Sequence, residues 1–168
     1  MMKDLDNIEL VPGKSQCFVS ATNISLHQVI EKVLGISGKA EVLICSFSIA
    51  EDSLRVLHRL KQNGKISRLT LLFDKSVRRH KMDLLGFCHS FADDIYLNES
   101  HIKLVLINNQ FFNISIITSA NLTNNERYEY YIISNVDEII EATITAISSL
   151  LQLSKKHKLD GAGETEVN

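Results

Sequence analysis

One stretch of the sequence carries side chains suited to phosphate chemistry. His101 and Lys103 stand two residues apart, and Ser119 and Asn121 repeat this spacing further along the chain. Because side chains alternate between the two faces of a strand, each pair is expected to point to one face. An imidazole can attack phosphorus or carry a proton, while an ammonium and a carboxamide can bind the non-bridging oxygens. The set therefore predicts a site for a phosphate group.

The elements that position these residues can be inferred from the same region. Residues 102–107 and 111–118 have the pattern of two strands, and the Asn-Asn-Gln sequence at 108–110 predicts a hairpin turn between them. Such a hairpin would bring the two pairs side by side. A further strand is expected over 128–134, where Glu129 could accept the second ring N–H of His101 and fix its tautomer.

The segment before the hairpin predicts a parallel unit. Residues 41–48 and 66–73 are near-continuous apolar runs, typical of strands covered on both faces. Leucines at helical spacing between them indicate a helix that ends at Asn63-Gly64, so the three elements form a right-handed crossover. The other expected elements are a strand over 16–20, a helix over 26–34, a basic helix over 75–91, a short strand over 95–97 and a long helix over 137–157.

Length and composition indicate a single soluble domain. The chain has 168 residues, of which 45% are hydrophobic and 23% charged. We expect a lead-in over 1–15, a domain over 16–158 and a flexible tail over 159–168. The first residues do not resemble a signal peptide, and the apolar runs are too short to cross a bilayer. Three widely spaced cysteines fit a reducing compartment, so we expect a cytoplasmic protein without membrane contact.

Charge limits how such a chain could hold a polyanion. The 18 Lys and Arg against 20 Asp and Glu give a formal net charge of -2, whereas proteins that hold nucleic acid by overall charge are usually basic. Any polyanion must therefore meet a local basic site. Residues 78–81 form a compact basic run, which is either a solvated helix face or a phosphate-backbone contact. Residues 155–158 fall at the expected end of the last helix, where the helix dipole favours cations.

The stretch from His101 to Glu129 resembles the phospholipase D superfamily. That family's signature is His-x-Lys, followed by a Gly/Ser-Ser-x-Asn turn and often by a later glutamate, and it is matched by His101, Lys103, Ser119, Asn121 and Glu129. The sequence Ser-Ala-Asn-Leu-Thr at 119–123 is similar to the form in the nuclease-like branches, of restriction-enzyme and helicase-associated type. The resemblance covers roughly residues 19–134 by pattern. It implies an α/β fold, an α-β-α sandwich around a mixed, largely parallel sheet.

The resemblance also implies a metal-independent phosphodiesterase, and a nuclease in particular, with no cofactor. In this family one histidine attacks phosphorus to form a phosphohistidine, and a second histidine protonates the leaving oxygen. Because the chain has one His-x-Lys motif, the resemblance implies a homodimer in which two copies of His101 meet at one site. Lys103 and Asn121 would bind the phosphate oxygens, Ser119 would hydrogen-bond the phosphate, and Glu129 would orient His101.

Two departures from the family pattern leave an alternative open. Asn108 stands five residues after Lys103, where the family often has an aspartate, and Thr118 replaces the glycine before Ser119. The alternative is a catalytically weak or inactive module of the same fold that binds nucleic acid or protein. A lipid phosphodiesterase is a third interpretation, ranked lower because the sequence shows no amphipathic membrane-facing segment.

Nucleic acid, and DNA in particular, is the expected partner, with sequence specificity supplied by a larger complex. Candidate phosphate or nucleic-acid contacts, besides Lys103 and Asn121, are Thr123, Arg127, Arg78 and Arg79. The tyrosines on both sides of Glu129 have two interpretations. They pack the sheet against the last helix, or one of them stacks on a base.

Overall fold

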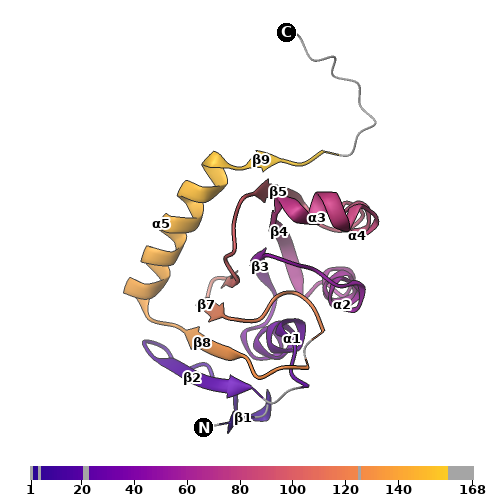
Figure 1. Cartoon of the computed structure of the whole chain (residues 1–168). Helices are drawn as coiled ribbons and strands as arrows, with labels where there is room; N and C mark the ends of the chain where they lie inside the picture. Colours follow the sequence, from indigo (N-terminus) through magenta and orange to yellow (C-terminus); the bar gives the residue numbers. More distant parts are fainter. Residues whose placement is uncertain (1, 4, 21–22, 125, 159–168) are drawn as a thin grey trace.

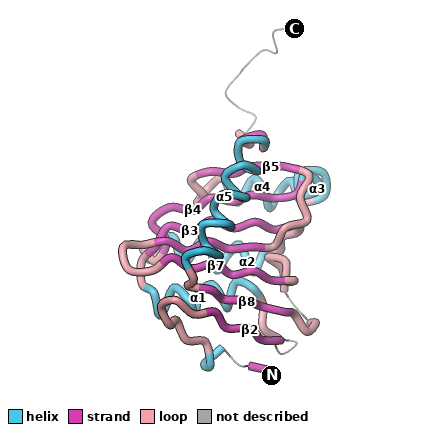
Figure 2. The backbone as a smooth tube through the Cα atoms, turned by 90° about the vertical axis from the view of Figure 1, so that its left-hand side faces the viewer, coloured by secondary structure: helices cyan, strands magenta, loops and turns pink. Residues whose placement is uncertain are grey.

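The computed structural model describes residues 2–3, 5–20, 23–124 and 126–158. These residues form one nine-stranded sheet with helices on both faces. One face is covered by α1 (Leu26–Ser37), α2 (Glu51–Gln62), α3 (Lys75–His80) and α4 (Met82–Cys88), and the other is crossed by α5 (Asp137–Leu153) (Figures 1 and 2). The expected α-β-α sandwich is confirmed.

The sheet is mixed, and its strand order is β1-β2-β8-β7-β6-β3-β4-β5-β9. β3, β4 and β5 are parallel neighbours, whereas β6, β7 and β8 join the sheet through antiparallel pairs. The parallel part is smaller than expected, because, besides the expected hairpin of β6 and β7, the pairs β3–β6, β2–β8 and β5–β9 are also antiparallel. The strands are β1 (Met2–Lys3), β2 (Ser15–Ser20), β3 (Ala40–Ser46), β4 (Ile66–Asp74), β5 (Asp94–Asn98), β6 (Leu104–Asn108), β7 (Asn113–Thr118), β8 (Tyr130–Ser134) and β9 (Lys155–Lys156).

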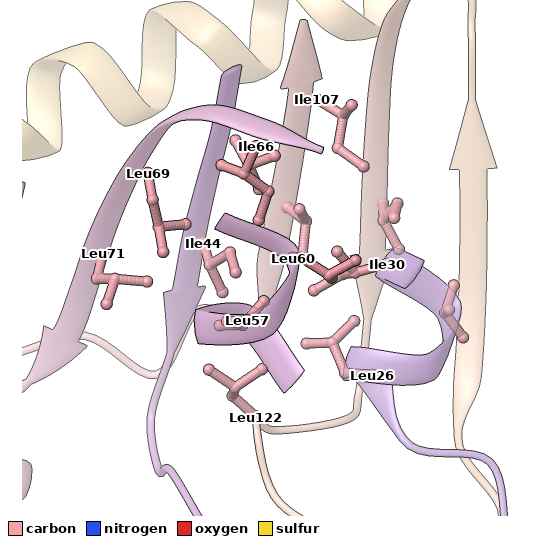
Figure 3. Close-up of a cluster of buried hydrophobic side chains, with 14 of the residues drawn as sticks. Leu26, Ile30, Ile44, Leu57, Leu60, Ile66, Leu69, Leu71, Ile107 and Leu122 are labelled. Carbon is pink, nitrogen blue, oxygen red and sulfur yellow. The ribbon is translucent and has the colours of Figure 1, made fainter. Parts of the chain in front are cut away.

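The core lies between the sheet and the helices α1 and α2. Leu26 of α1, Leu57 of α2 and Ile44 of β3 are fully buried there (Figure 3). Leu122, from the segment after β7, is fully buried in the same cluster. Because a buried leucine contributes strongly to stability, this side chain anchors the loop that follows β7 onto the core.

The basic helix expected over 75–91 is two short helices in the structure. α3 begins after Asp74, whose carboxylate accepts the Ser76 N–H at 2.8 Å. The helix breaks at Lys81, where φ is -142° and ψ is 44°. The Lys81 Nζ donates to Ser48 Oγ at 3.0 Å and to the carbonyl of Ile49. These contacts tie the break to the loop after β3.

The last helix is shorter than expected, and the basic run after it forms a strand. α5 ends at Leu153, and β9 pairs with the outer edge of β5. The His157 N–H then donates to the Ile95 carbonyl at 2.8 Å, and its Nδ1 lies 2.7 Å from Nε2 of His89. The helix-dipole explanation of residues 155–158 is therefore wrong, because strand pairing holds this run in place.

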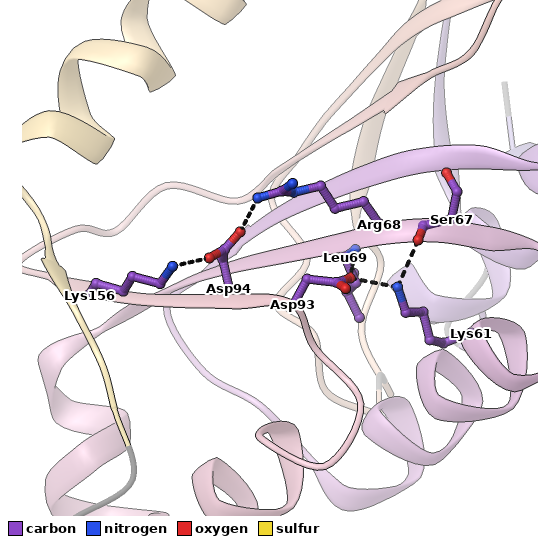
Figure 4. A network of polar contacts seen from close by, with 7 residues as sticks. All are labelled: Lys61, Ser67, Arg68, Leu69, Asp93, Asp94 and Lys156. Carbon is purple, nitrogen blue, oxygen red and sulfur yellow. Dashed lines mark hydrogen bonds and ion pairs between the residues drawn. The ribbon is translucent and has the colours of Figure 1, made fainter. Parts of the chain in front are cut away.

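Two neighbouring aspartates connect β5 to the strands and helix around it (Figure 4). Asp93 accepts from Lys61 Nζ at 2.5 Å, and Asp94 accepts from Arg68 at 2.5 Å and from Lys156. The hydrogen bond from Lys156 is the main cause that holds the pKa of Asp94 below its usual value; burial opposes it and Arg68 reinforces it. β9 is thus fixed to β5 by an ion pair as well as by the main chain.

The residues before β2 also pack on the domain. β1 pairs with β2 in parallel, and Ile8 is buried in the main core. The Gly13 N–H donates to the Asn135 carbonyl at 2.8 Å. The expected tail, 159–168, lies outside the described residues.

Candidate active site

The candidate residues gather at one edge of the sheet. β3, β4 and β5 end at this edge, and β6 begins there, because it runs antiparallel to β3 with Leu104 opposite Cys45. β7 ends and β8 begins at the same edge, since Thr118 pairs with Tyr131. Ligands of open α/β sheets usually bind at the carboxyl ends of the parallel strands. The edge is therefore the expected place for a site.

The predicted hairpin is confirmed. Leu104 pairs with Ile117 and Asn108 with Asn113, and the Thr118 N–H donates to the Lys103 carbonyl at 3.3 Å. β6 begins at Leu104, so His101 and Lys103 precede the strand rather than lie within it. The hairpin still brings Lys103 next to the segment that continues into Ser119.

His101 and Lys103 lie together at the start of β6. The Lys103 Nζ is 3.0 Å from the Nδ1 atom of His101 and donates to its carbonyl at 2.9 Å. The exposed imidazole packs against Phe47, with the ring centroids 4.5 Å apart. Partial burial lowers the pKa of Lys103, and the Glu129 carboxylate opposes that shift. The pair thus presents an imidazole and a cation side by side at the surface.

Ser119 and Glu129 form the second pair at the site. The Ser119 Oγ donates to the Glu129 carboxylate and accepts the Tyr130 N–H at 3.0 Å. Among the described residues, Glu129 makes this contact rather than the expected one with His101. The reason is strand register, since β8 begins beside the end of β7 and places the carboxylate next to the serine.

The loop that carries Asn121 is anchored by the next residue in the chain, Leu122. The Leu122 N–H donates to the buried Ser46 Oγ at 2.9 Å, and the Leu122 carbonyl accepts the Ala50 N–H at 2.9 Å. The Asn121 Oδ1 is buried and has no hydrogen-bond partner in the described part of the chain. Buried polar atoms are nearly always paired, so this amide is not placed by stability alone.

The other candidate contacts lie further from this centre. Thr123 is half-buried, and the next residue, Asn124, donates to Asp52 of α2 at 2.5 Å. Arg127 is exposed on the loop before β8. Arg78 and Arg79 are exposed on α3, where they line a hollow with residues 155–158.

The tyrosines near Glu129 divide between the two interpretations. Tyr131 is fully buried and stacks on Phe18, with the ring centroids 5.3 Å apart, and it belongs to the core cluster of α1 and α2, so it packs the sheet against those helices and not against the last helix as expected. Tyr128 and Tyr130 are exposed. Of the three tyrosines near Glu129, Tyr128 and Tyr130 are therefore the ones whose rings could contact a ligand.

Three residues at this edge were not predicted from the sequence: Ser46, Phe47 and Lys81. Ser46 positions the loop of Asn121, Phe47 supports the His101 ring, and Lys81 holds the loop after β3. A signal for the first two was present, because they end a predicted parallel strand at the edge where ligands bind. Nothing in the sequence connects Lys81 to that loop.

Two other features bear on the chemistry. Within the described ranges, no three His, Cys, Asp or Glu side chains come together as a group that could hold a metal ion. None of the helices described is both long enough and apolar enough to span a membrane.

Several solved structures of known proteins share this arrangement of strands and helices. NucT from Helicobacter pylori is similar over 86% of this chain and 99% of its own, with a TM-score of 0.64 and 19% identity. Nuc from Salmonella typhimurium, a phospholipase D family member, is similar over 86% and 98%, with a TM-score of 0.65 and 15% identity. The chain has a phospholipase D-like fold.

A third similar structure is larger. Phosphatidylserine synthase from Haemophilus influenzae matches 90% of this chain but only 41% of its own length, with a TM-score of 0.66 and 17% identity. No protein-family model and no curated protein matches the sequence. The likeness therefore rests on the arrangement of the elements, and the chemistry must be argued from the residues at the edge.

Proposed function

We propose that this protein is a phosphodiesterase that cleaves nucleic acid, DNA in particular, through a covalent intermediate on His101. One observation supports the proposal: an exposed imidazole and the Lys103 ammonium lie together beside the strand that continues into Ser119 and Asn121, at the edge of a phospholipase D-like fold where β3, β4 and β5 end. This combination supplies a nucleophile for phosphorus and donors for its oxygens.

The reaction follows from these groups. A ring nitrogen of His101 attacks phosphorus, a P–N bond forms, and the P–O bond to the leaving group breaks. The leaving oxygen takes a proton from a second imidazole. Water then gives a proton to the second imidazole and attacks phosphorus, the P–N bond breaks, and both histidines are regenerated with a phosphomonoester as product. Lys103 and the Asn121 amide stabilise the charge on the non-bridging oxygens, and the Ser119–Glu129 pair fixes the wall beside them.

The second imidazole is proposed to come from another copy of the chain. The exposed position of His101 leaves it open to a partner surface, and a two-fold axis through the edge would place two copies of it face to face. Light scattering is expected to give twice the chain mass of 18.9 kDa. A monomer that still cleaves would contradict this part of the proposal.

The replaced aspartate does not argue against activity. Asn108 ends β6 at the opposite edge of the sheet and hydrogen-bonds Asn113 across the hairpin. Five residues of strand at about 3.3 Å each separate it from Lys103 by roughly 17 Å. A carboxylate at position 108 would therefore lie far from His101. Its replacement by an amide removes no group from the edge of the sheet at which His101 and Lys103 lie.

The test is cleavage of labelled single- and double-stranded DNA in excess EDTA. Lys103→Gln is expected to lower the rate at least tenfold, because one charged donor to the phosphate is lost. The control is Lys65→Gln, an exposed lysine just before β4 at the opposite edge, which is expected to cleave as the unsubstituted chain does. Equal rates for both variants would refute the role of Lys103.

A binding module without turnover is the second candidate. It is favoured by Thr118 in place of the usual glycine before Ser119, since this threonine hydroxyl is engaged with the Ala120 N–H at 3.0 Å. Tight, salt-dependent DNA binding with no cleavage under any condition tested would establish it. Hydrolysis of phospholipid vesicles but not of DNA would instead establish the lipid interpretation.

A further inference from the structure

Two basic segments far apart in the sequence line one hollow on the surface. Its volume is about 600 Å³, and its walls come from α3 and from the run that contains β9. The basic side chains that line it are Lys75, Arg78, Arg79, Lys155, Lys156 and Lys158. The chain as a whole carries a net charge of -2, so this concentration of positive charge is local.

The hollow is a built feature of the fold. β9 pairs with β5, with Leu97 opposite Lys155, and the His157 N–H donates to the Ile95 carbonyl at 2.8 Å. The ring of His157 is hydrogen-bonded to His89 of the segment after α4. The other wall, α3, is fixed by its Asp74 cap. Both basic walls are therefore held by the sheet rather than by loose loops.

Part of the positive charge is left for a ligand. Lys75 pairs with Glu99 at 3.0 Å, and Lys156 pairs with Asp94. Lys155 and Lys158 are exposed and form no ion pair within the described ranges, and Arg79 is exposed with the Asp74 carboxylate as an electrostatic neighbour. Cations that face one concave surface and outnumber their acidic neighbours suit an anion with several charges.

One end of the hollow lies at the same edge of the sheet as His101, where β4 and β5 end, and its other end, at Lys158, extends along β5 toward the start of that strand. α3 begins where β4 ends, and its break at Lys81 is tied to Ser48, the residue after Phe47. A second, smaller hollow of about 310 Å³ between Phe47 and Lys81 lies between the two places. β6, β3, β4 and β5 are consecutive strands, so at about 4.8 Å per strand Leu97 of β5, which lines the basic hollow, lies roughly 14 Å from the start of β6 that follows His101.

We propose that this hollow binds the phosphate backbone of a nucleic acid several nucleotides away from the phosphate at His101. The proposal deepens the proposed function and rests on it. Successive phosphates of one DNA strand advance about 3.4 Å along the duplex axis, so roughly four base pairs span the 14 Å. A phospholipid carries a single phosphodiester at its head group and could not reach both places. The second site thus selects a polynucleotide.

The test uses two matched double variants, each combined with His101→Ala so that the DNA stays intact. Lys155→Gln/Lys158→Gln removes two charges from the hollow. Lys39→Gln/Lys65→Gln removes two exposed charges from the opposite edge, before β3 and β4. Binding of a fluorescent 20-base-pair duplex is followed by anisotropy between 0.05 and 0.3 M salt.

The hollow variant is expected to bind the duplex at least ~10-fold more weakly at 0.1 M salt, with the log–log salt slope reduced by about 1.8. The control variant is expected to keep the slope of the parent. Arg79→Gln, on the other wall, should reduce the slope by about 0.9. All variants should melt at the parent's temperature, because the substituted side chains are exposed.

Two results would overturn the proposal: equal slopes for the hollow and control variants, or an equal loss of binding to vesicles of anionic phospholipid. A failure of the proposed catalytic function would give a different result from a failure of the proposed binding site. If the unsubstituted chain cleaves no phosphodiester but the hollow variant still loses duplex affinity, the catalytic role of His101 is refuted and the nucleic-acid site stands.

Discussion

Substitution of Ser46 by alanine tests how the loop of Asn121 is held. The Ser46 side chain is 2% exposed, donates to the Ser48 carbonyl at 2.6 Å and accepts the Leu122 N–H at 2.9 Å. Alanine leaves that N–H buried without a partner, which costs about 1–3 kcal/mol. For a chain of this size, each kcal/mol lowers the melting temperature by about 2–4 °C.

The assay is urea unfolding at pH 7, with Ser90→Ala as the matched control. The Ser90 hydroxyl also donates to a main-chain carbonyl, that of Phe87 at 2.7 Å, but it is exposed to water. Its removal is expected to cost less than about 0.5 kcal/mol. If Ser46 positions the loop, Ser46→Ala also lowers the cleavage rate at saturating DNA. A loss of stability no larger than that of Ser90→Ala would refute the reasoning.

Two further predictions concern the fold. Leu57→Ala is expected to lower the free energy of unfolding by about 2–5 kcal/mol because it opens a cavity in the core, whereas Leu153→Ala, at an 81% exposed position, should cost less than about 0.5 kcal/mol. Equal losses in urea unfolding would contradict the packing described. Asp94→Asn should destabilise the chain at pH 7. Because the folded pKa of Asp94 is lowered, its contribution is present above about pH 4 and lost as the pH falls further. The difference from the unsubstituted chain should therefore shrink at pH 3, and a constant difference would argue against the ion pairs.

The sheet and the hairpin could be predicted from local sequence. The apolar runs at 41–48 and 66–73 identify buried strands because both of their faces are covered. The polar run at 108–110 predicted the hairpin of β6 and β7, although Asn108 belongs to β6 and the turn spans 109–112. From these elements, the approach of Lys103 to the segment of Ser119 follows directly. The residue types and their spacing along the chain were sufficient to predict this approach, because the pairing of two strands fixes which of their residues are neighbours.

Contacts between distant segments could not be predicted in the same way. The partner of Glu129 depends on where β8 starts relative to β7, which a shift of one residue would change. The pairing of β9 with β5 depends on a free sheet edge that the basic run itself does not reveal. For the same reason, the hollow shared by α3 and residues 155–158 was not foreseen, although both runs stood out by their charge.

The central claim is that His101 forms a covalent bond to phosphorus without a metal ion. The measurement is cleavage of labelled DNA in excess EDTA by the unsubstituted chain and by His101→Ala at equal concentration. Circular dichroism should first show the same helix content for both proteins, so that a difference in rate does not come from unfolding. The account predicts EDTA-resistant cleavage that falls at least ~1,000-fold in His101→Ala, because the loss of a nucleophile removes the covalent pathway. Cleavage by His101→Ala at the rate of the unsubstituted chain would contradict it.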